Sequence, residues 1–202
     1  MLITSIEEQK KHKDRVNIYV DGNFFCGMSL MTCTKYHLKA GCEVDEDRLK
    51  FLTEELEKEN AMEKALLHLS KRQKTKSEME KFLLEKGFEA NIIEYVIGKL
   101  EEYSYINDEK YVRDYIKSYI NKEGAKKMEF ALKMKGIDEE LISSALQETE
   151  FDESVIMNLA QKYIKNRPLD LKTKQNLYRH LASKGFESDK IISVINSIFT
   201  NN

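Results

Sequence analysis

The stretch LLEKGF at residues 83–88 decides the fold, because two counterparts follow it at a constant interval. They are LKMKGI at 132–137 and LASKGF at 181–186. The glycines of the three copies, Gly87, Gly136 and Gly185, are 49 residues apart (136 − 87 and 185 − 136). A fixed interval of this length indicates tandem structural repeats.

Each of these glycines is predicted to end a helix. Each follows a run that contains leucine, and glycine tolerates the positive φ of a helix C-cap, where a Cβ would clash. Beyond each glycine, apolar residues recur six, nine and ten positions later, which is the spacing of one helix face. They are Ile93, Val96 and Ile97 in the first copy, Ile142, Ala145 and Leu146 in the second, and Ile191, Val194 and Ile195 in the third.

Another periodic apolar stretch precedes each glycine-terminated helix, so each repeat is predicted to hold three helices. Thr75 with Glu78 forms a capping box, and Asn107 or Asp108 is expected to cap a further helix. Units this small must bury apolar surface against one another. The expected fold is mainly α, with three three-helix units at 61–106, 107–153 and 154–202 in an elongated, curved array.

Residues 1–60 follow a different pattern and are predicted to form a β-hairpin and helical module. Strands are expected at 15–20 and 23–28, joined by a tight turn at Asp21-Gly22. A short helix near 32–40 is expected to stop at Gly41, and a second helix to run from Val44 to about Lys58. Because a two-stranded hairpin is marginal alone, it must pack on a helix or on a partner chain.

Composition favours a cytoplasmic protein. Only one proline accompanies 34% charged residues, no stretch reaches the roughly 18 apolar residues of a membrane span, and the N-terminus lacks a signal-peptide core. Cys26, Cys33 and Cys42 are expected to be reduced thiols. A zinc site of Cys33, His37 and Cys42 is an alternative, although it lacks a fourth ligand.

The sequence contains no recognisable catalytic motif. Neither GxxxxGK[ST] nor GxGxxG occurs, and His12, His37, His68 and His180 are far apart. The acidic run 138–140 falls in the first turn of a helix, where carboxylates complement the helix dipole. We therefore expect a binding protein without cofactor or metal; an enzyme whose groups come together only on folding is a distant alternative.

Positive charge gathers at two helix junctions. The run 71–76 holds four cations and no acid, and residues 154–202 carry eight basic and three acidic residues. A charge run can be a solvated face, or it can bind an anionic surface, either phosphates or acidic protein. The binding candidates are Lys71, Arg72, Lys74 and Lys76 in the first repeat, and Lys162, Lys165, Arg167, Lys172 and Lys174 in the third.

Tyrosines 103, 105, 111, 115 and 119 follow helical spacing in part. Most are expected to pack in the core or between repeats, and base stacking is the alternative for this group.

These features together resemble the RecX family, the regulators of the bacterial recombinase RecA. The resemblance rests on ALLHLSKR at 65–72, TKSEM at 75–79, LLEKGF at 83–88, YINDEKY at 105–111 and the segment 132–137. It covers essentially the whole chain, and the N-terminal hairpin is similar to that of members from Gram-positive bacteria. It implies tandem three-helix units.

The resemblance also implies a function in DNA recombination, repair and SOS regulation. The protein would bind along the RecA filament on single-stranded DNA and suppress ATP hydrolysis, strand exchange and co-protease activity, with Lys71, Arg72, Lys74 and Lys76 as contact residues. We expect a monomer that contacts no membrane and that touches the DNA directly or through the filament. The alternative is a helical repeat protein that binds nucleic acid alone.

Two departures from the family pattern stand out. Tyr103-Ser104-Tyr105 replaces a common glycine-containing turn, and Tyr111 replaces a more usual phenylalanine. Both changes look conservative for packing. The acidic second repeat argues against a model in which every repeat grips DNA. Replacing the four cations of the first repeat by alanine is expected to leave the fold intact, because exposed substitutions change stability little.

Overall fold

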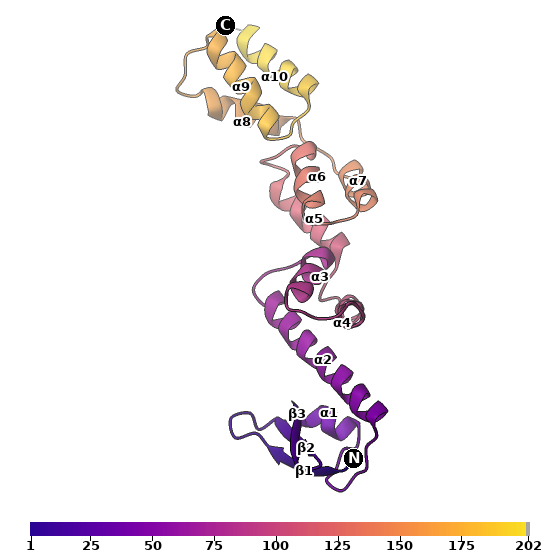
Figure 1. Ribbon diagram of the computed structural model, residues 1–202. Coiled ribbons are helices and arrows are strands. Elements are labelled where there is room, and N and C mark those ends of the chain that lie inside the picture. Colours follow the sequence, from indigo (N-terminus) through magenta and orange to yellow (C-terminus); the bar gives the residue numbers. More distant parts are fainter. Residues whose placement is uncertain (201–202) are drawn as a thin grey trace. The chain divides into compact units, whose positions relative to one another are not determined.

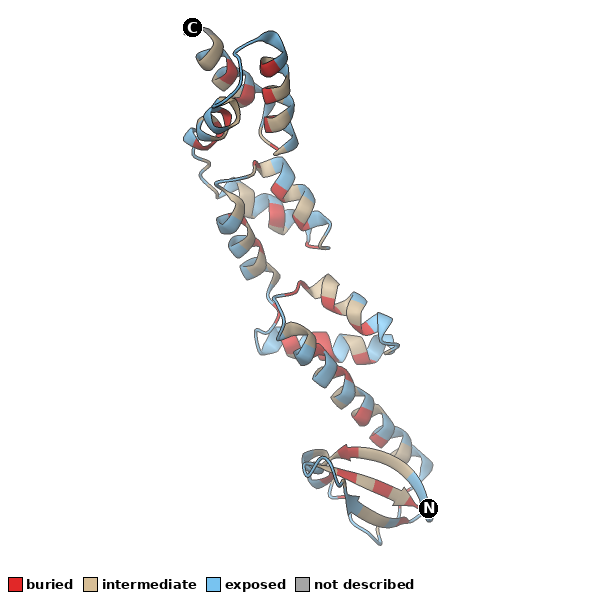
Figure 2. Ribbon diagram, turned by 90° about the vertical axis from the view of Figure 1, so that its left-hand side faces the viewer, coloured by how far each residue is buried: buried red, intermediate tan, exposed pale blue. Residues whose placement is uncertain are grey.

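The structure is a computed structural model that describes residues 1–200, in which three strands precede ten helices (Figure 1). The mainly helical class predicted from the repeat is confirmed. The chain divides into two compact units: Met1–His68 with Leu83–Val96, and Leu69–Phe82 with the residues from Ile97 onward. Within them, buried residues form stripes along the helices (Figure 2). No helix among the described residues combines the length and apolar character needed to cross a membrane.

The N-terminal sheet contains the predicted hairpin. β2 (Arg15–Val20) and β3 (Asn23–Ser29) pair antiparallel, and the alternating Val16, Ile18 and Val20 are buried. Asp21 and Gly22 have φ of 48° and 82°, the positive values of a tight hairpin turn. The strand assignments at 15–20 and 23–28 are therefore confirmed to within a residue.

A third strand, β1 (Ile3–Glu8), pairs with β2 and gives the sheet order β1-β2-β3. The sequence prediction of two strands was incomplete. Only Ile3 and Ile6 are apolar in this strand, so its alternation is weak, yet Ile3 is fully buried. The hairpin packs on this third strand as well as on a helix.

The short helix α1 (Leu30–Lys35) ends earlier than predicted. His37, with φ of 53°, takes the left-handed position after it, and the N–H of Leu38 donates to the carbonyl of Cys33. Gly41 also has positive φ, but its N–H donates to the carbonyl of Ile3, 2.8 Å away. The expected helix over 32–40 is thus wrong in its second half, because Gly41 serves the turn beside β1.

Helix α2 (Glu46–Leu69) is continuous over 24 residues and joins two helices that the sequence placed separately. Leu52 and Leu56 belong to the same core as Ile3 and Val16 of the sheet. The proposed boundary at residue 60 falls inside this helix.

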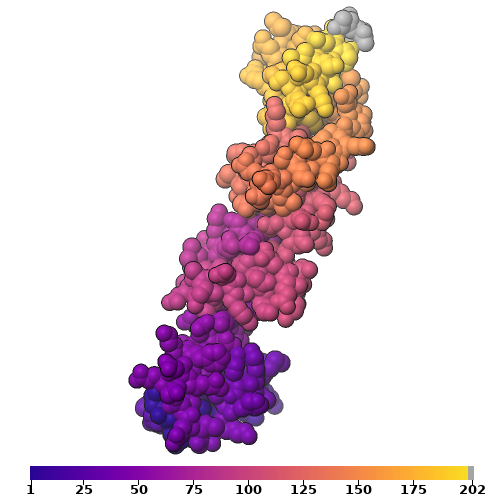
Figure 3. Space-filling view, turned by 90° about the vertical axis from the view of Figure 1, so that its right-hand side faces the viewer, coloured from indigo at the N-terminus to yellow at the C-terminus, as the bar shows by residue number. Residues whose placement is uncertain are grey.

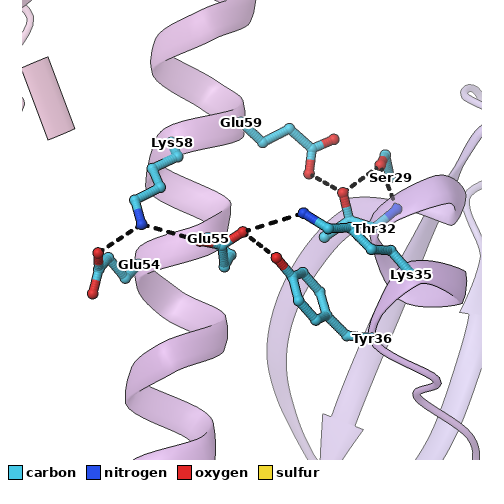
Figure 4. A network of polar contacts seen from close by, with 8 residues as sticks. All are labelled: Ser29, Thr32, Lys35, Tyr36, Glu54, Glu55, Lys58 and Glu59. Carbon is cyan, nitrogen blue, oxygen red and sulfur yellow. Dashed lines mark hydrogen bonds and ion pairs between the residues drawn. The ribbon is translucent and has the colours of Figure 1, made fainter. Parts of the chain in front are cut away.

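A polar network joins α2 to α1 (Figure 4). The hydroxyl of Tyr36 donates to the carboxylate of Glu55, and Thr32 Oγ1 donates to Glu59 Oε2 at 3.0 Å. The ammonium nitrogen of Lys35 lies 3.8 Å from Oε2 of the same Glu55 carboxylate. These contacts hold the middle of α2 to α1 and to the residue that follows it.

The remaining helices repeat in the order expected from the glycines. They are α3 (Lys76–Glu85), α4 (Ala90–Glu102), α5 (Asp108–Tyr119), α6 (Ala125–Lys133), α7 (Glu139–Gln147), α8 (Ser154–Ile164), α9 (Leu171–Ser183) and α10 (Ser188–Thr200). Leu83, Leu132 and Leu181 are fully buried. In the first repeat Ile92 is fully buried and Ile93 only half-buried, a shift of one residue from the pattern.

The three glycines occupy equivalent helix ends. Gly87, Gly136 and Gly185 have φ of 84°, 71° and 84°. Around Gly87, the N–H of Phe88 donates to the carbonyl of Leu83 and that of Gly87 to Leu84, which is the Schellman arrangement. The same two bonds recur around the other two glycines. The capping box is also present, since Thr75 and Glu78 exchange hydrogen bonds of 3.2 and 3.1 Å, and Asn107 caps α5.

Successive repeats of the second unit contact one another through these glycine turns. Thr75 Oγ1 donates to the carbonyl of Lys135 at 2.7 Å, and the N–H of Gly124 donates to the carbonyl of Lys184 at 2.8 Å. Gly124 lies 49 residues after Thr75, as Lys184 does after Lys135, so the two joints are equivalent. The elongated, curved arrangement of all three repeats stays a prediction.

Candidate partner-binding surface

The first group of cations lies where α2 passes into α3. Lys71 and Arg72 follow the end of α2 and are exposed. They extend into solvent from a short connection between two helices. Both cations are therefore accessible to an anionic partner.

Lys74 differs from the expectation, because its side chain is buried with 8% exposure. Burial lowers the pKa of its ammonium group, and the neighbouring charge of Arg72 lowers it further. The prediction that all four cations are exposed is therefore wrong at this residue. Replacing Lys74 by alanine would remove packed side-chain atoms as well as a charge.

Lys76, the first residue of α3, has two contacts with later parts of the chain. Its Nζ lies 3.1 Å from a carboxylate oxygen of Glu101, and its backbone N–H donates to Asp108 Oδ1 at 3.0 Å. Burial raises the pKa of Asp108, while the hydrogen bond from Lys76 opposes that shift. Lys76 therefore contributes to the structure of the first joint and is only half-exposed.

The second group of cations lies on the third repeat. Lys162, Lys165, Arg167 and Lys172 are exposed, and Lys174 is half-buried with its ammonium 5.9 Å from the ring centroid of Phe199. Lys172 and Lys174 stand 98 residues after Lys74 and Lys76, whereas the second repeat has Glu123 and Ala125 at these positions. Cations thus occupy equivalent positions in the first and third repeats. The two groups of cations do not form a single site.

A stack of three side chains near Arg167 was not foreseen from the sequence. The Arg167 guanidinium lies 3.8 Å from the Tyr163 ring centroid and also donates to the Tyr163 carbonyl. Tyr163 stacks on His180 with centroids 4.6 Å apart. Burial lowers the pKa of His180, and the charges of Lys184 and Arg167 add to this effect. The four-residue spacing of Tyr163 and Arg167, across the end of α8, was the available signal.

The tyrosines divide into two sets. Tyr111, Tyr115 and Tyr119 are half-buried against the core of the second repeat, as expected, and Tyr115 stacks on Tyr119 at 4.5 Å. Tyr103 and Tyr105 are exposed. The ammonium of Lys135 lies 5.5 Å from the Tyr111 ring centroid. Tyr111, which stands where phenylalanine is more usual, therefore contacts a cation.

Side chains that could bind a metal ion do not gather in the part of the chain described. Across residues 1–200, no three His, Cys, Asp or Glu side chains are placed to hold a metal ion. Cys26, Cys33 and Cys42 are free thiols, and burial with the nearby Cys33 raises the pKa of Cys26 to about 12. Asp138 caps α7, with two glutamates in the first turn, as the helix-dipole interpretation predicted.

Family models match four successive segments of the chain. Residues 1–45 match the "Regulatory protein RecX N-terminal domain", and residues 61–100, 107–146 and 152–195 match the first, second and third three-helix domains of RecX. Two curated relatives, both named "Regulatory protein RecX", span nearly all of the chain. The protein of Clostridium perfringens strain 13 is 35% identical, covering 99% of this chain and 97% of its own. That of Clostridioides difficile strain 630 is 34% identical, covering 98% and 95%.

Two solved structures share the architecture. One, titled "Crystal structure of regulatory protein RecX", has a TM-score of 0.76 at 28% identity and covers 100% of this chain and 99% of its own. The other, RecX from Lactobacillus salivarius, has a TM-score of 0.65 at 25% identity, covering 72% of this chain and 98% of its own.

Proposed function

Because the chain belongs to the RecX family of regulatory proteins, we propose that it binds the RecA recombinase filament on single-stranded DNA. There it inhibits or modulates ATP hydrolysis, strand exchange and co-protease activity, and so acts in DNA recombination, repair and SOS regulation. The observation that carries this proposal is the ordered match of all four RecX segments over residues 1–195. The protein acts in the cytoplasm as a monomer, by binding and without a reaction of its own.

The distribution of charge supports contact through separate repeats. Lys71 and Arg72 of the first repeat are exposed, and so are Lys162, Lys165 and Lys172 of the third. Residues 107–153, between them, carry eight basic and twelve acidic residues. A polymer that presents alternating anionic patches would be contacted by the outer two repeats, while the middle one sets their spacing.

The direct test is the ATPase activity of RecA on single-stranded DNA as the protein is added at sub-stoichiometric amounts. Hydrolysis should fall along the titration. The matched control is RecA without DNA, which reports on any effect that does not require the filament. An ATPase rate that stays constant across the titration would contradict the proposal.

The second candidate is a protein that binds nucleic acid by itself, favoured by the excess of cations in residues 154–202. Its affinity for single-stranded DNA without RecA should then weaken steeply as salt rises, because phosphate contacts release counterions. Tight, salt-sensitive binding to bare DNA together with an unchanged RecA ATPase would favour this candidate over filament regulation.

A further inference from the structure

A groove of about 460 Å³ lies between α9 and α10, helices that fall in the light-orange to yellow range of the colour scale in Figure 3. Leu171 and Ile192 in its lining are 71% and 46% exposed, while Ile195 is buried. Leaving such apolar side chains in water is unfavourable, so a surface that covers them would stabilise a complex. Lys174, Gln175, Tyr178 and Arg179 also line the groove.

The apolar lining is particular to the third repeat. The positions of Leu171, Tyr178 and Ile192 hold different residues 49 and 98 positions earlier. They are Lys122, Glu129 and Ser143 in the second repeat, and Gln73, Glu80 and Glu94 in the first. The same fold therefore tolerates polar residues at all three positions, so the architecture does not require apolar ones there.

Part of this groove corresponds to a surface that is an interface in the first repeat. The N–H of Lys76 bonds to Asp108 of the second repeat, and a Cβ on Gly136 would lie 2.2 Å from Ser77 Oγ. The counterparts of Lys76 and Ser77 in the third repeat are Lys174 and Gln175, which line the groove. The groove thus continues a face that this fold already uses for docking.

Helix α9 also differs from its counterparts at this face. It begins at Leu171. The equivalent helices α3 and α6 begin at Lys76 and Ala125, which both correspond to residue 174, so α9 begins earlier than its counterparts. The additional turn carries Leu171 and Lys172 toward solvent. It extends the apolar lining and adds a cation beside it.

The charges around the groove indicate what kind of segment fits it. Lys174 and Arg179 line it, and the repeat carries eight basic against three acidic residues. Apolar side chains beside cations suit an amphipathic segment with carboxylates. A second copy of the chain would offer a glycine turn to this groove. Each glycine turn carries a lysine (Lys86, Lys135 or Lys184), which would repel the cations of the groove, so the charges disfavour self-association.

We propose that the α9–α10 groove binds an acidic, amphipathic segment of a partner protein. Apolar side chains of that segment pack on Leu171 and Ile192, and its carboxylates face Lys174 and Arg179. The acidic, amphipathic character of the ligand follows from the groove alone. The identification of the partner as the RecA filament rests on the proposed function.

The first experiment uses two short fluorescent peptides with leucines spaced as on one helix face. The remaining positions are glutamate in one peptide and lysine in the other. The acidic peptide should bind the full-length protein at least about tenfold more tightly, as expected for apolar anchors with complementary charge. Equal affinity, or tighter binding of the basic peptide, would overturn the proposal.

Variants locate the site. Leu171→Gln with Ile192→Ser introduces residues that the other repeats have at these positions, so folding should be retained while affinity for the acidic peptide falls about tenfold. Lys174→Gln with Arg179→Gln should reduce the preference for the acidic over the basic peptide. Met134→Gln, which changes an apolar residue directly after α6 that is about as exposed as Leu171, is the control and should change neither.

Hydrogen exchange separates the possible occupants. RecA filaments on single-stranded DNA should protect α9 and α10, and DNA alone should not. Protection by DNA alone, or protection that grows with the concentration of the protein itself, would overturn the proposal in favour of a nucleic acid or a second copy. If wild-type protein fails to inhibit RecA but still selects the acidic peptide, only the proposed function fails.

Discussion

The ammonium group of Lys135 lies 2.9 Å from the carboxylate of Glu78, 57 residues earlier in the chain. The lysine belongs to the Lys-Gly pair of the second repeat, and the glutamate completes the capping box of the first. Burial alone would raise the pKa of Glu78, but hydrogen bonds from Lys135 and from the Thr75 N–H outweigh it, so the net pKa is lowered. One carboxylate therefore caps a helix and joins two repeats.

Glu78→Gln should reduce stability by about 1–2 kcal/mol at neutral pH, since it weakens both contacts while keeping the shape of the side chain. A lowered folded-state pKa stabilises the fold above the ordinary value of 4.5, and this contribution is lost as pH falls through the folded value. Urea unfolding of both proteins should show their difference shrinking as the pH falls below 4.5. Exposed Glu89→Gln is the control, and a pH-independent difference for Glu78→Gln would refute the role of the ion pair.

Gly185→Ala should destabilise the protein much more than Gly87→Ala, although both glycines have φ of 84°. A Cβ at residue 87 has open space, so that variant bears only backbone strain of about 1–2 kcal/mol. At residue 185 the Cβ would lie 2.4 Å from the backbone nitrogen of Lys127, which cannot move aside as a side chain can. Melting followed by circular dichroism should separate the two variants, and equal losses would contradict the joint described at Gly185.

Gly136→Val tests the equivalent joint, because the new side chain would meet Ser77 at positive φ. It should destabilise by about 3 kcal/mol or more. An unchanged melting curve would show that this glycine is not needed at its helix end.

Ser104→Gly should stabilise the protein by about 0.5–1 kcal/mol. Ser104 has φ of 58° after α4, and the N–H of Tyr105 donates to the carbonyl of Leu100, so serine occupies the position that glycine prefers in a Schellman motif. Relief of left-handed strain exceeds the extra entropy that glycine gains on unfolding. Ser118→Gly inside α5 is the matched control and should destabilise by about 1 kcal/mol, so a loss in both variants would refute the argument.

Lys71→Ala with Arg72→Ala should weaken inhibition of RecA without changing the melting temperature, because both side chains are exposed. Adding Lys74→Ala should lower the melting temperature, since Lys74 is buried. Lys117→Ala with Lys126→Ala removes two exposed cations from the acidic second repeat and should leave RecA inhibition intact. Equal loss of inhibition in both pairs would mean that overall charge matters and position does not.

The repeat architecture was accessible from sequence because its signals are local and occur three times. A glycine at a helix end and an apolar residue directly after it recur in all three repeats, and they depend only on neighbours in the chain, as does the capping box of the first repeat. The hairpin at Asp21-Gly22 was predictable for the same reason.

The features that sequence missed depend on contacts between distant residues. β1 has a weak pattern of its own and is defined by pairing with β2, as in Ile3 with Val20. The burial of Lys74 and the Lys135–Glu78 pair arise where one repeat meets the next. The exposure of Leu171 and Ile192 in the α9–α10 groove could not be predicted, because leucine and isoleucine at helical spacing normally indicate core.

Helix α2 changes how the chain can be divided. The similarity to the first three-helix domain begins at residue 61, yet the helix starts at Glu46, after Asp45, whose carboxylate accepts from the N–H of Arg48. A truncated protein beginning at 61 would retain only a short, uncapped end of that helix, too brief to hold its shape in water. Residues 83–96 belong to the same compact unit as most of α2, where Lys58 lies 4.9 Å from the Tyr95 ring centroid and Lys64 lies 4.8 Å from that of Phe88, so cutting α2 should also destabilise part of the first repeat.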